Sequence, residues 1–128
     1  MTSDPHVFGK AAEIAAEEHL CRKGYRILDR NVRYPNGELD IVARDHETVV
    51  FVEVKARRSD EFGGAYYAVT RQKTKKLTNL ALQYVRQHHL QDCPCRFDVI
   101  LLQGESHSSC TLDHIENAFE VPGNDSRW

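Results

Sequence analysis

Two short stretches decide the fold of this chain: residues 37–43, with the sequence GELDIVA, and residues 49–55, with the sequence VVFVEVK. Both are rich in the branched apolar residues that favour β-strands, and a polar turn at residues 45–47 separates them. They predict two strands, 38–44 and 48–56, joined as a tight antiparallel hairpin.

The second strand of this hairpin carries two charges among apolar residues. Side chains alternate along a strand, so Glu53 and Lys55 share one face, opposite the core-building valines at positions 50, 52 and 54. Charges in such a strand are costly to bury unless they are paired or bind a metal. The hairpin brings Asp40 beside Glu53, and neighbouring carboxylates repel, raise each other's pKa and attract a divalent cation. The pattern therefore predicts a metal site.

The same residues suit the hydrolysis of a phosphodiester bond. Mg²⁺ or Mn²⁺ takes oxygen ligands and keeps several waters, so Asp40 and Glu53 suffice to hold it, with the carbonyl of Val54 as a further ligand. Such an ion neutralises charge on a phosphate and lowers the pKa of a bound water. Lys55 would orient that water, and Glu38, on the same face as Asp40, would be an outer partner. A Glu-x-Lys pattern alone is common by chance, and the competing interpretation is a surface salt bridge at a strand end.

Outward from the hairpin, helices and strands continue to alternate. We expect a helix at 8–23 that ends at Gly24, a strand at 25–33, a turn at 35–37, a loop at 63–64, a helix at 71–88, a strand at 96–102, a strand or helix at 112–119 and a polar tail at 122–128. This order predicts an α/β domain with helices packed on a mixed sheet.

The composition is that of an ordinary globular protein. The 128 residues are 41% hydrophobic and 28% charged, which fits one domain over 1–128 with a core at about 8–120 and polar tails. The four cysteines show no disulfide framework, the first residues show no leader, and the apolar runs are too short to span a bilayer. We therefore expect a cytoplasmic protein with reduced thiols and no membrane association.

The charge is unevenly distributed. The net charge of −2 argues against a protein that coats nucleic acid non-specifically. Residues 55–76 nevertheless carry seven bases and two acids, and residues 22–33 carry five bases and one acid. Such segments can form a local phosphate-binding face, although a solvated helix face is the alternative. The candidates for contacts with a nucleic-acid backbone are Arg57, Arg58, Arg71, Lys73 and Lys76.

Three other features contain residues that can bind a metal. Glu13 lies at the edge of the apolar arc of the first helix, where it is either a boundary residue or a side chain that leans toward Asp40 and Glu53. Asp98, in an apolar strand, is more consistent with a hydrogen-bonded strand-end residue than with a ligand. The soft ligands at positions 88, 89, 93 and 95 fit no common zinc spacing.

Several motifs together resemble the YraN family of uncharacterised bacterial proteins. They are GKAAE at 9–13, GYRILDRN at 24–31, GELDIVA at 37–43, VFVEVK at 50–55, FGGA at 62–65, Lys73 with Leu77, and CRFDV at 95–99. The resemblance runs from about residue 8 to about residue 120. That family is similar to the restriction-endonuclease-like superfamily and, within it, to archaeal Holliday-junction resolvases.

This resemblance implies an αβββαβ core and metal-dependent endonuclease chemistry. The superfamily pattern of a helix glutamate, an aspartate and Glu-x-Lys matches Glu13, Asp40, Glu53 and Lys55, with Glu13 binding Mg²⁺ or Mn²⁺ directly or through water. It also favours a DNA structure over RNA as the substrate and, by analogy with resolvases, a homodimer. Two alternatives stay open: a nucleic-acid-binding module that does not cleave, and a protein-interaction scaffold whose carboxylates pair with Lys55.

Overall fold

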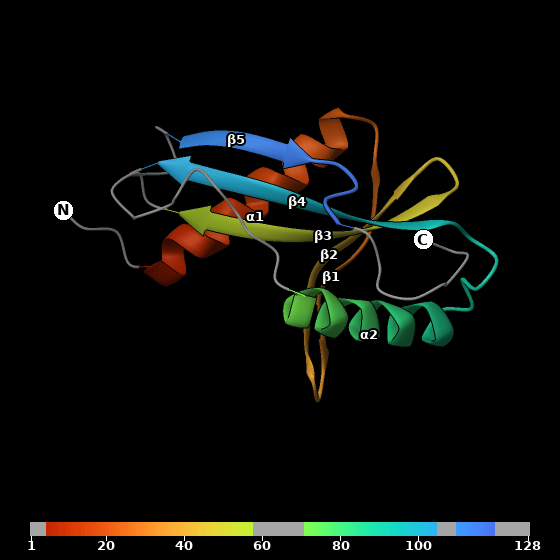
Figure 1. The fold of residues 1–128 in the computed structure, drawn as a ribbon. Coiled ribbons are helices and arrows are strands. Elements are labelled where there is room, and N and C mark those ends of the chain that lie inside the picture. Colours follow the sequence, from red (N-terminus) through yellow and green to blue (C-terminus); the bar gives the residue numbers. More distant parts are fainter. Residues whose placement is uncertain (1–4, 58–70, 105–109, 120–128) are drawn as a thin grey trace.

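A computed structural model describes residues 5–57, 71–104 and 110–119 of the chain (Figure 1). The elements are α1 (Pro5–Arg22), β1 (Arg26–Tyr34), β2 (Gly37–Asp45), β3 (Thr48–Arg57), α2 (Arg71–Gln87), β4 (Cys95–Gly104) and β5 (Cys110–Ile115). This order confirms the predicted αβββαβ core. The segment expected as a strand or helix at 112–119 contains the end of a fifth strand. No described helix is long and apolar enough to cross a membrane.

The strands form one mixed sheet in the order β1-β2-β3-β4-β5. Neighbouring strands are antiparallel except β3 and β4, which are parallel. Parallel neighbours need a long crossover, and the segment between β3 and β4 contains α2. The mixed sheet predicted from the element order is therefore confirmed.

The two helices cover opposite faces of the sheet (Figure 1). Val49 and Phe51 of β3 pack into the core on the α2 side, whereas Val50 and Val52 pack into the core on the α1 side. The expected core position of Val50 and Val52 is therefore confirmed, and the face of Glu53 contributes to a second core, because a sheet covered on both sides buries alternate residues in both directions. Glu53 and Lys55 continue a face whose earlier residues are buried beneath α2.

Helix α1 has the predicted apolar arc and the predicted end. Ala12, Ala16 and Leu20, spaced four residues apart, are buried in the α1-side core. Gly24 follows the helix with a φ of 91°, and Tyr25 donates its backbone N–H to the carbonyl of Leu20 at 3.0 Å. This left-handed residue closes the helix and starts β1 in a new direction.

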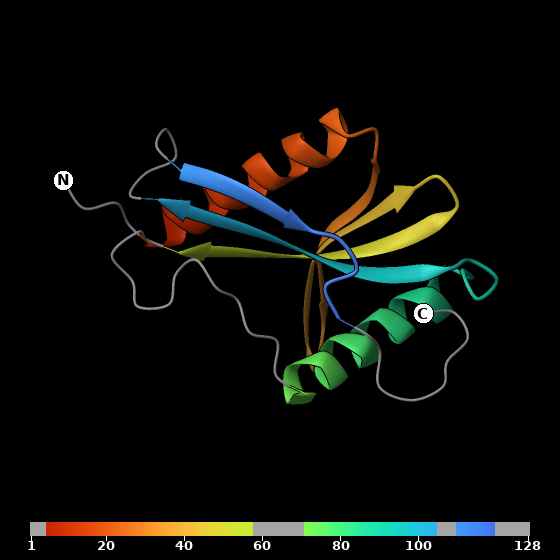
Figure 2. The same ribbon diagram turned by 45° about the horizontal axis from the view of Figure 1, so that its top comes forward.

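The hairpin of β1 and β2 bends sharply in its middle (Figure 2). Asn31 has a φ of 52°, and it lies with Asp40 between the paired positions Arg30–Ile41 and Val32–Leu39. As a result Leu39 packs on the α2 side, while Ile41, two residues further, packs on the α1 side. Asparagine tolerates this left-handed conformation better than branched residues do. Asp40 therefore lies where the hairpin crosses from one core to the other.

The far half of the hairpin lies against α2. Gly37 has a φ of 149°, and a Cβ at this position would lie 3.1 Å from both Leu80 Cδ1 and Lys76 Cε. The hydroxyl of Tyr34 donates to Gln87 Oε1 at 2.7 Å. Glycine at the start of β2 thus permits both the backbone conformation and the close approach of the helix.

Candidate metal centre

Asp40 is a partly buried carboxylate on the hairpin bend. The backbone pairing of β2 with β3 ends at Ile41 and Val52. At the preceding residue, Asp40, the side chain takes over the hydrogen bond to β3. Its Oδ2 accepts the backbone N–H of Val54 at 2.9 Å. Burial, and to a smaller extent the negative charges of Glu53, Glu13 and Glu38, together raise the pKa of Asp40 to about 6, although the hydrogen bond from the Val54 N–H lowers it. The folded chain therefore holds a carboxylate that is unfavourably charged at neutral pH.

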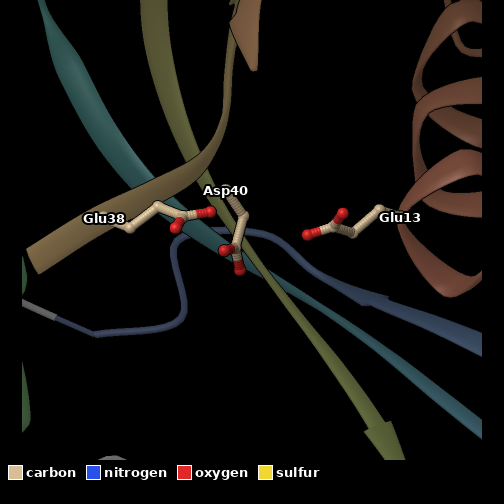
Figure 3. Close-up of side chains that lie close together, drawn as sticks. All are labelled: Glu13, Glu38 and Asp40. Atoms are coloured by element: carbon tan, nitrogen blue, oxygen red, sulfur yellow. The ribbon is translucent and has the colours of Figure 1, made fainter. Parts of the chain in front are cut away.

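Three carboxylates converge at this bend. Glu13, Glu38 and Asp40 each offer one oxygen, and the three oxygens lie within 4.8 Å of one another. Figure 3 shows Glu38 and Glu13 approaching Asp40 from opposite sides. Helix α1 brings Glu13, and β2 carries both Glu38 and Asp40, the latter at the bend. The cluster could hold a metal ion, and Glu38, expected as an outer partner, belongs to it.

Glu53 lies near the cluster but is bound to a lysine. Its Oε1 is 2.8 Å from Nζ of Lys73, and its side chain is only 17% exposed. Lys73 comes from the first turn of α2. The charge of Glu53 still raises the pKa of Asp40, so the two carboxylates interact as the hairpin predicted. Lys73 was expected to contact phosphate, and its pairing with Glu53 is not visible in the sequence because α2 and β3 are distant along the chain.

Lys55 is half-buried among the same charges. Burial lowers the pKa of Lys55, the neighbouring cations Lys73 and Arg57 lower it further, and the carboxylates of Glu53 and Asp40 oppose this shift. The structure therefore brings Lys55 within the electrostatic reach of both predicted carboxylates. A lysine whose charge is weakly favoured is suited to donate a hydrogen bond or to lose a proton.

Two hollows meet at Glu38 and Asp40. The one on the α1 side has a volume of about 450 Å³, and Lys10, Glu13 and Arg33 are among its lining residues. The one on the α2 side is smaller, about 40 Å³, and reaches Glu53. The larger hollow is thus lined by carboxylates and by two bases, Lys10 and Arg33, which are not among the candidates predicted from the sequence. Their place in the hollow beside the bend is what makes these two bases candidates for the site.

Comparison with known proteins identifies the family. Residues 12–102 match the model of the uncharacterised protein family UPF0102. The chain belongs to this family. A UPF0102 protein of Desulfosudis oleivorans is 40% identical over 121 residues, covering 94% of this chain and 96% of the relative. A UPF0102 protein of Pseudomonas entomophila is 47% identical over 121 residues, covering 92% and 97%. The family resemblance seen in the motifs is confirmed, and the UPF0102 match includes Glu13, Asp40, Glu53, Lys55 and Lys73.

A solved structure is also similar. The structure of Pyrococcus furiosus SfsA in complex with Ca²⁺ matches with a TM-score of 0.43 and 20% sequence identity. The match covers 88% of this UPF0102 chain and 64% of that chain, so this protein spans about two thirds of the length of SfsA.

Asp98 belongs to a separate, buried network rather than to the metal centre. Arg96 Nε lies 3.0 Å from Asp98 Oδ1, His114 Nε2 lies 2.8 Å from Oδ2, and the backbone N–H of Asn117 donates to Oδ1 at 3.0 Å. Burial raises the pKa of Asp98, but these hydrogen bonds more than offset it, and the pKa is lowered. The expected hydrogen bonding is confirmed; the expected strand-end position is wrong, because Asp98 is the fourth residue of β4.

The remaining predicted residues are the bases expected to contact phosphate and the histidine and cysteine residues near the end of α2. Lys76 is exposed and Arg57 is half-buried, whereas Arg58, the loop at 63–64 and the side chain of Arg71 lie outside the described residues. Of the soft ligands whose spacing fits no common zinc site, His88 stacks on Tyr84 with ring centroids 4.0 Å apart. Among the described side chains, the acidic cluster is the group with metal-binding geometry.

Proposed function

We propose that this protein is a metal-dependent nuclease that hydrolyses phosphodiester bonds in a nucleic acid, DNA in preference to RNA, in the cytoplasm. The observation that carries the proposal is Asp40. It is a partly buried carboxylate with a pKa of about 6 beside Glu13 and Glu38, and its charge, with that of Glu53, acts on Lys55. Titratable groups in a hollow whose pKa values are shifted by burial and by neighbouring charges are typical of functional sites.

The donor set fits Mg²⁺ or Mn²⁺. Asp40, Glu13 and Glu38 offer only oxygen atoms, which these hard cations prefer, and Glu53 is a fourth carboxylate nearby. A doubly positive ion would offset the mutual repulsion that now raises the pKa of Asp40. When bound, the ion supplies charge neutralisation on the phosphate and a water of lowered pKa.

The basic residues around the cluster take the other roles. The ammonium of Lys55 would donate a hydrogen bond to the attacking water or to a phosphate oxygen on which charge develops. Lys10 and Arg33 would contact the nucleic-acid backbone from the α1-side hollow, and Lys76 and Arg57 from the other side. The Val54 N–H would keep Asp40 in place during this step.

Asp40→Asn distinguishes a metal site from a structural ion pair. The pKa of Asp40 is 3.8 in an unfolded chain and about 6 in the folded one, so the folded state binds more protons between these values. Stability therefore falls as pH rises through this range, and the loss is complete above it. We expect Asp40→Asn to increase the free energy of unfolding by about 1–2 kcal/mol near pH 8 without metal, and to give no gain near pH 3. Denaturant unfolding measures both.

Calorimetry with Mn²⁺ completes this test. We expect the wild type to bind Mn²⁺ and Asp40→Asn to bind it at least about tenfold more weakly, the scale of losing one charged ligand. Glu47→Gln, an exposed turn residue, is the control and should behave as the wild type. Equal Mn²⁺ binding by wild type and Asp40→Asn, or a less stable Asp40→Asn protein near pH 8, would contradict the metal site.

Cleavage is tested directly on flapped, branched and single-stranded DNA and RNA with Mg²⁺ and Mn²⁺. Asp40→Asn serves as the inactive control on every substrate. Metal-dependent cutting by the wild type alone supports the nuclease. Tight binding without any cutting would favour the nucleic-acid-binding module instead.

Replacing Arg57, Lys73 and Lys76 together by glutamine should flatten the salt dependence of nucleic-acid binding. Each base that contacts a phosphate of duplex DNA contributes about 0.9 to the slope of log affinity against log salt, so a reduction of about 2 or more is expected. Fluorescence anisotropy at several salt concentrations measures it. Replacing Arg86 by glutamine, which removes an exposed base outside both basic segments, should change the slope by much less. A wild-type slope near zero would exclude nucleic acid as the partner.

A further inference from the structure

The ion pair of Glu53 and Lys73 occupies the side of the cluster that the α1 carboxylate does not reach. Lys73 Nζ lies 2.8 Å from Glu53 Oε1, with the lysine side chain 33% exposed and the glutamate 17% exposed. Glu53 is thus held by a residue of α2 and lines the α2-side hollow, whereas Glu13 of α1 lines the α1-side hollow, and Asp40 lines both. The ammonium of Lys73 thus already offsets the charge of one of the four carboxylates.

The place of Lys73 in its helix makes this pairing informative. Lys73 is the third residue of α2, whose first turn contains no acidic residue. A positive charge there is opposed by the helix dipole. Its charge also acts on Lys55, since it is the largest neighbouring charge that lowers the pKa of Lys55. Two lysines and two carboxylates of the site therefore share one electrostatic environment.

We propose that Lys73 is a built-in counter-ion that competes with the metal for Glu53 and, once displaced, contacts the phosphate of the nucleic acid. This inference rests on the proposed function. Glu53 can satisfy either the ammonium or the metal with the same oxygen. When the metal takes Glu53, the ammonium loses its partner at the edge of the site, and a phosphate oxygen is the ligand that can replace it.

The consequence is a reciprocal coupling between metal and nucleic acid. The metal must displace Lys73, so its affinity in the free protein is reduced. Nucleic acid that binds the released ammonium restores the lost metal affinity. Metal and nucleic acid therefore each strengthen the binding of the other by the same factor. The site would therefore hold its metal firmly only when a substrate is present.

Lys73→Met tests this competition by Mn²⁺ calorimetry without nucleic acid. We expect the variant to bind Mn²⁺ about three- to fivefold more tightly than the wild type, the upper part of the range for a partly exposed ion pair. Lys75→Met removes the same charge from an exposed position two residues away and should change the affinity less than about twofold. Lys73→Arg keeps the pair with Glu53 and should bind Mn²⁺ close to the wild type. Thermal melts of all three variants verify that they are folded.

The coupling is measured by the anisotropy of a fluorescent flapped DNA with Ca²⁺ and with chelator. The wild type should bind this DNA several-fold more tightly with Ca²⁺, and Lys73→Met should lose most of that ratio while Lys75→Met keeps it. Equal Mn²⁺ affinities of Lys73→Met and Lys75→Met would overturn the competition, and an unchanged ratio would overturn the coupling. If Asp40→Asn weakens Mn²⁺ binding but Lys73→Met has no effect, only this inference fails. If Asp40→Asn has no effect either, the proposed function fails with it.

Discussion

Lys55→Ala is expected to reduce single-turnover cleavage by ~10²-fold or more while metal and substrate still bind, the scale of losing one preorganised charge-stabilising donor. Lys55 is half-buried beside Glu53, Asp40 and Lys73, whose charges all act on its pKa. Removal of its ammonium leaves the carboxylates in place. The rate should therefore fall without a matching loss of Mn²⁺ affinity.

This result separates chemistry from folding when both proteins are compared at saturating metal. Thermal melts should then differ little, because the metal neutralises the repulsion that the missing ammonium would otherwise leave. Lys75→Ala is the matched control, since it removes a lysine that is exposed on α2. A Lys55→Ala protein that melts much lower yet cuts normally would show that Lys55 serves a structural salt bridge.

Asp98→Ala is expected to lower the free energy of unfolding by about 3–5 kcal/mol, the cost of breaking one member of a buried charged pair. The carboxylate of Asp98 is fully buried, and the side chains of Arg96 and His114 are 20% and 4% exposed. Without Asp98, these two groups keep their burial but lose their principal acceptor. Arg96 would retain Asp45 and Tyr25 as partners, which is why the loss is not larger.

Urea unfolding measures this loss, and Mn²⁺ calorimetry gives the second readout. Asp113→Ala, on the neighbouring strand β5 and exposed, should change stability by less than about 0.5 kcal/mol. The Mn²⁺ affinity of Asp98→Ala should equal that of the wild type under conditions where both are folded. A loss of stability below about 1 kcal/mol would mean that the network is dispensable.

The fold could be predicted because its signals are local. The alternation in residues 48–56 and the helical period after residue 71 depend only on neighbouring residues, and both elements are found where expected. The segment from Leu112 onward gave no such signal, because β5 is a short strand whose central residues are exposed or half-buried. Its pairing with β4 decides its conformation, and that contact is not visible in a local pattern.

The site could be predicted only in part for the same reason. Asp40, Glu53 and Lys55 follow from one hairpin, but the approach of Glu38 and Glu13 depends on the bend at Asn31 and on how α1 docks. Asparagine with a positive φ inside a strand has no sequence signature that distinguishes it from an asparagine in a loop. The partner of Glu53 comes from α2, which is distant in sequence and joins the site only in three dimensions.

Because of the bend at Asn31 and Asp40, the acidic cluster is assembled only in the fully folded protein. Its three oxygens come from the helix that precedes the sheet and from a strand that must first be bent, so a partly assembled chain offers isolated carboxylates instead of a chelating set. An ion that binds this set recognises the native state and has little affinity for the unfolded one. By mass action, a hundredfold excess of ion over its dissociation constant would stabilise the native protein by about 2.7 kcal/mol. The protein would then resist proteolysis and heat to an extent set by the free metal concentration around it.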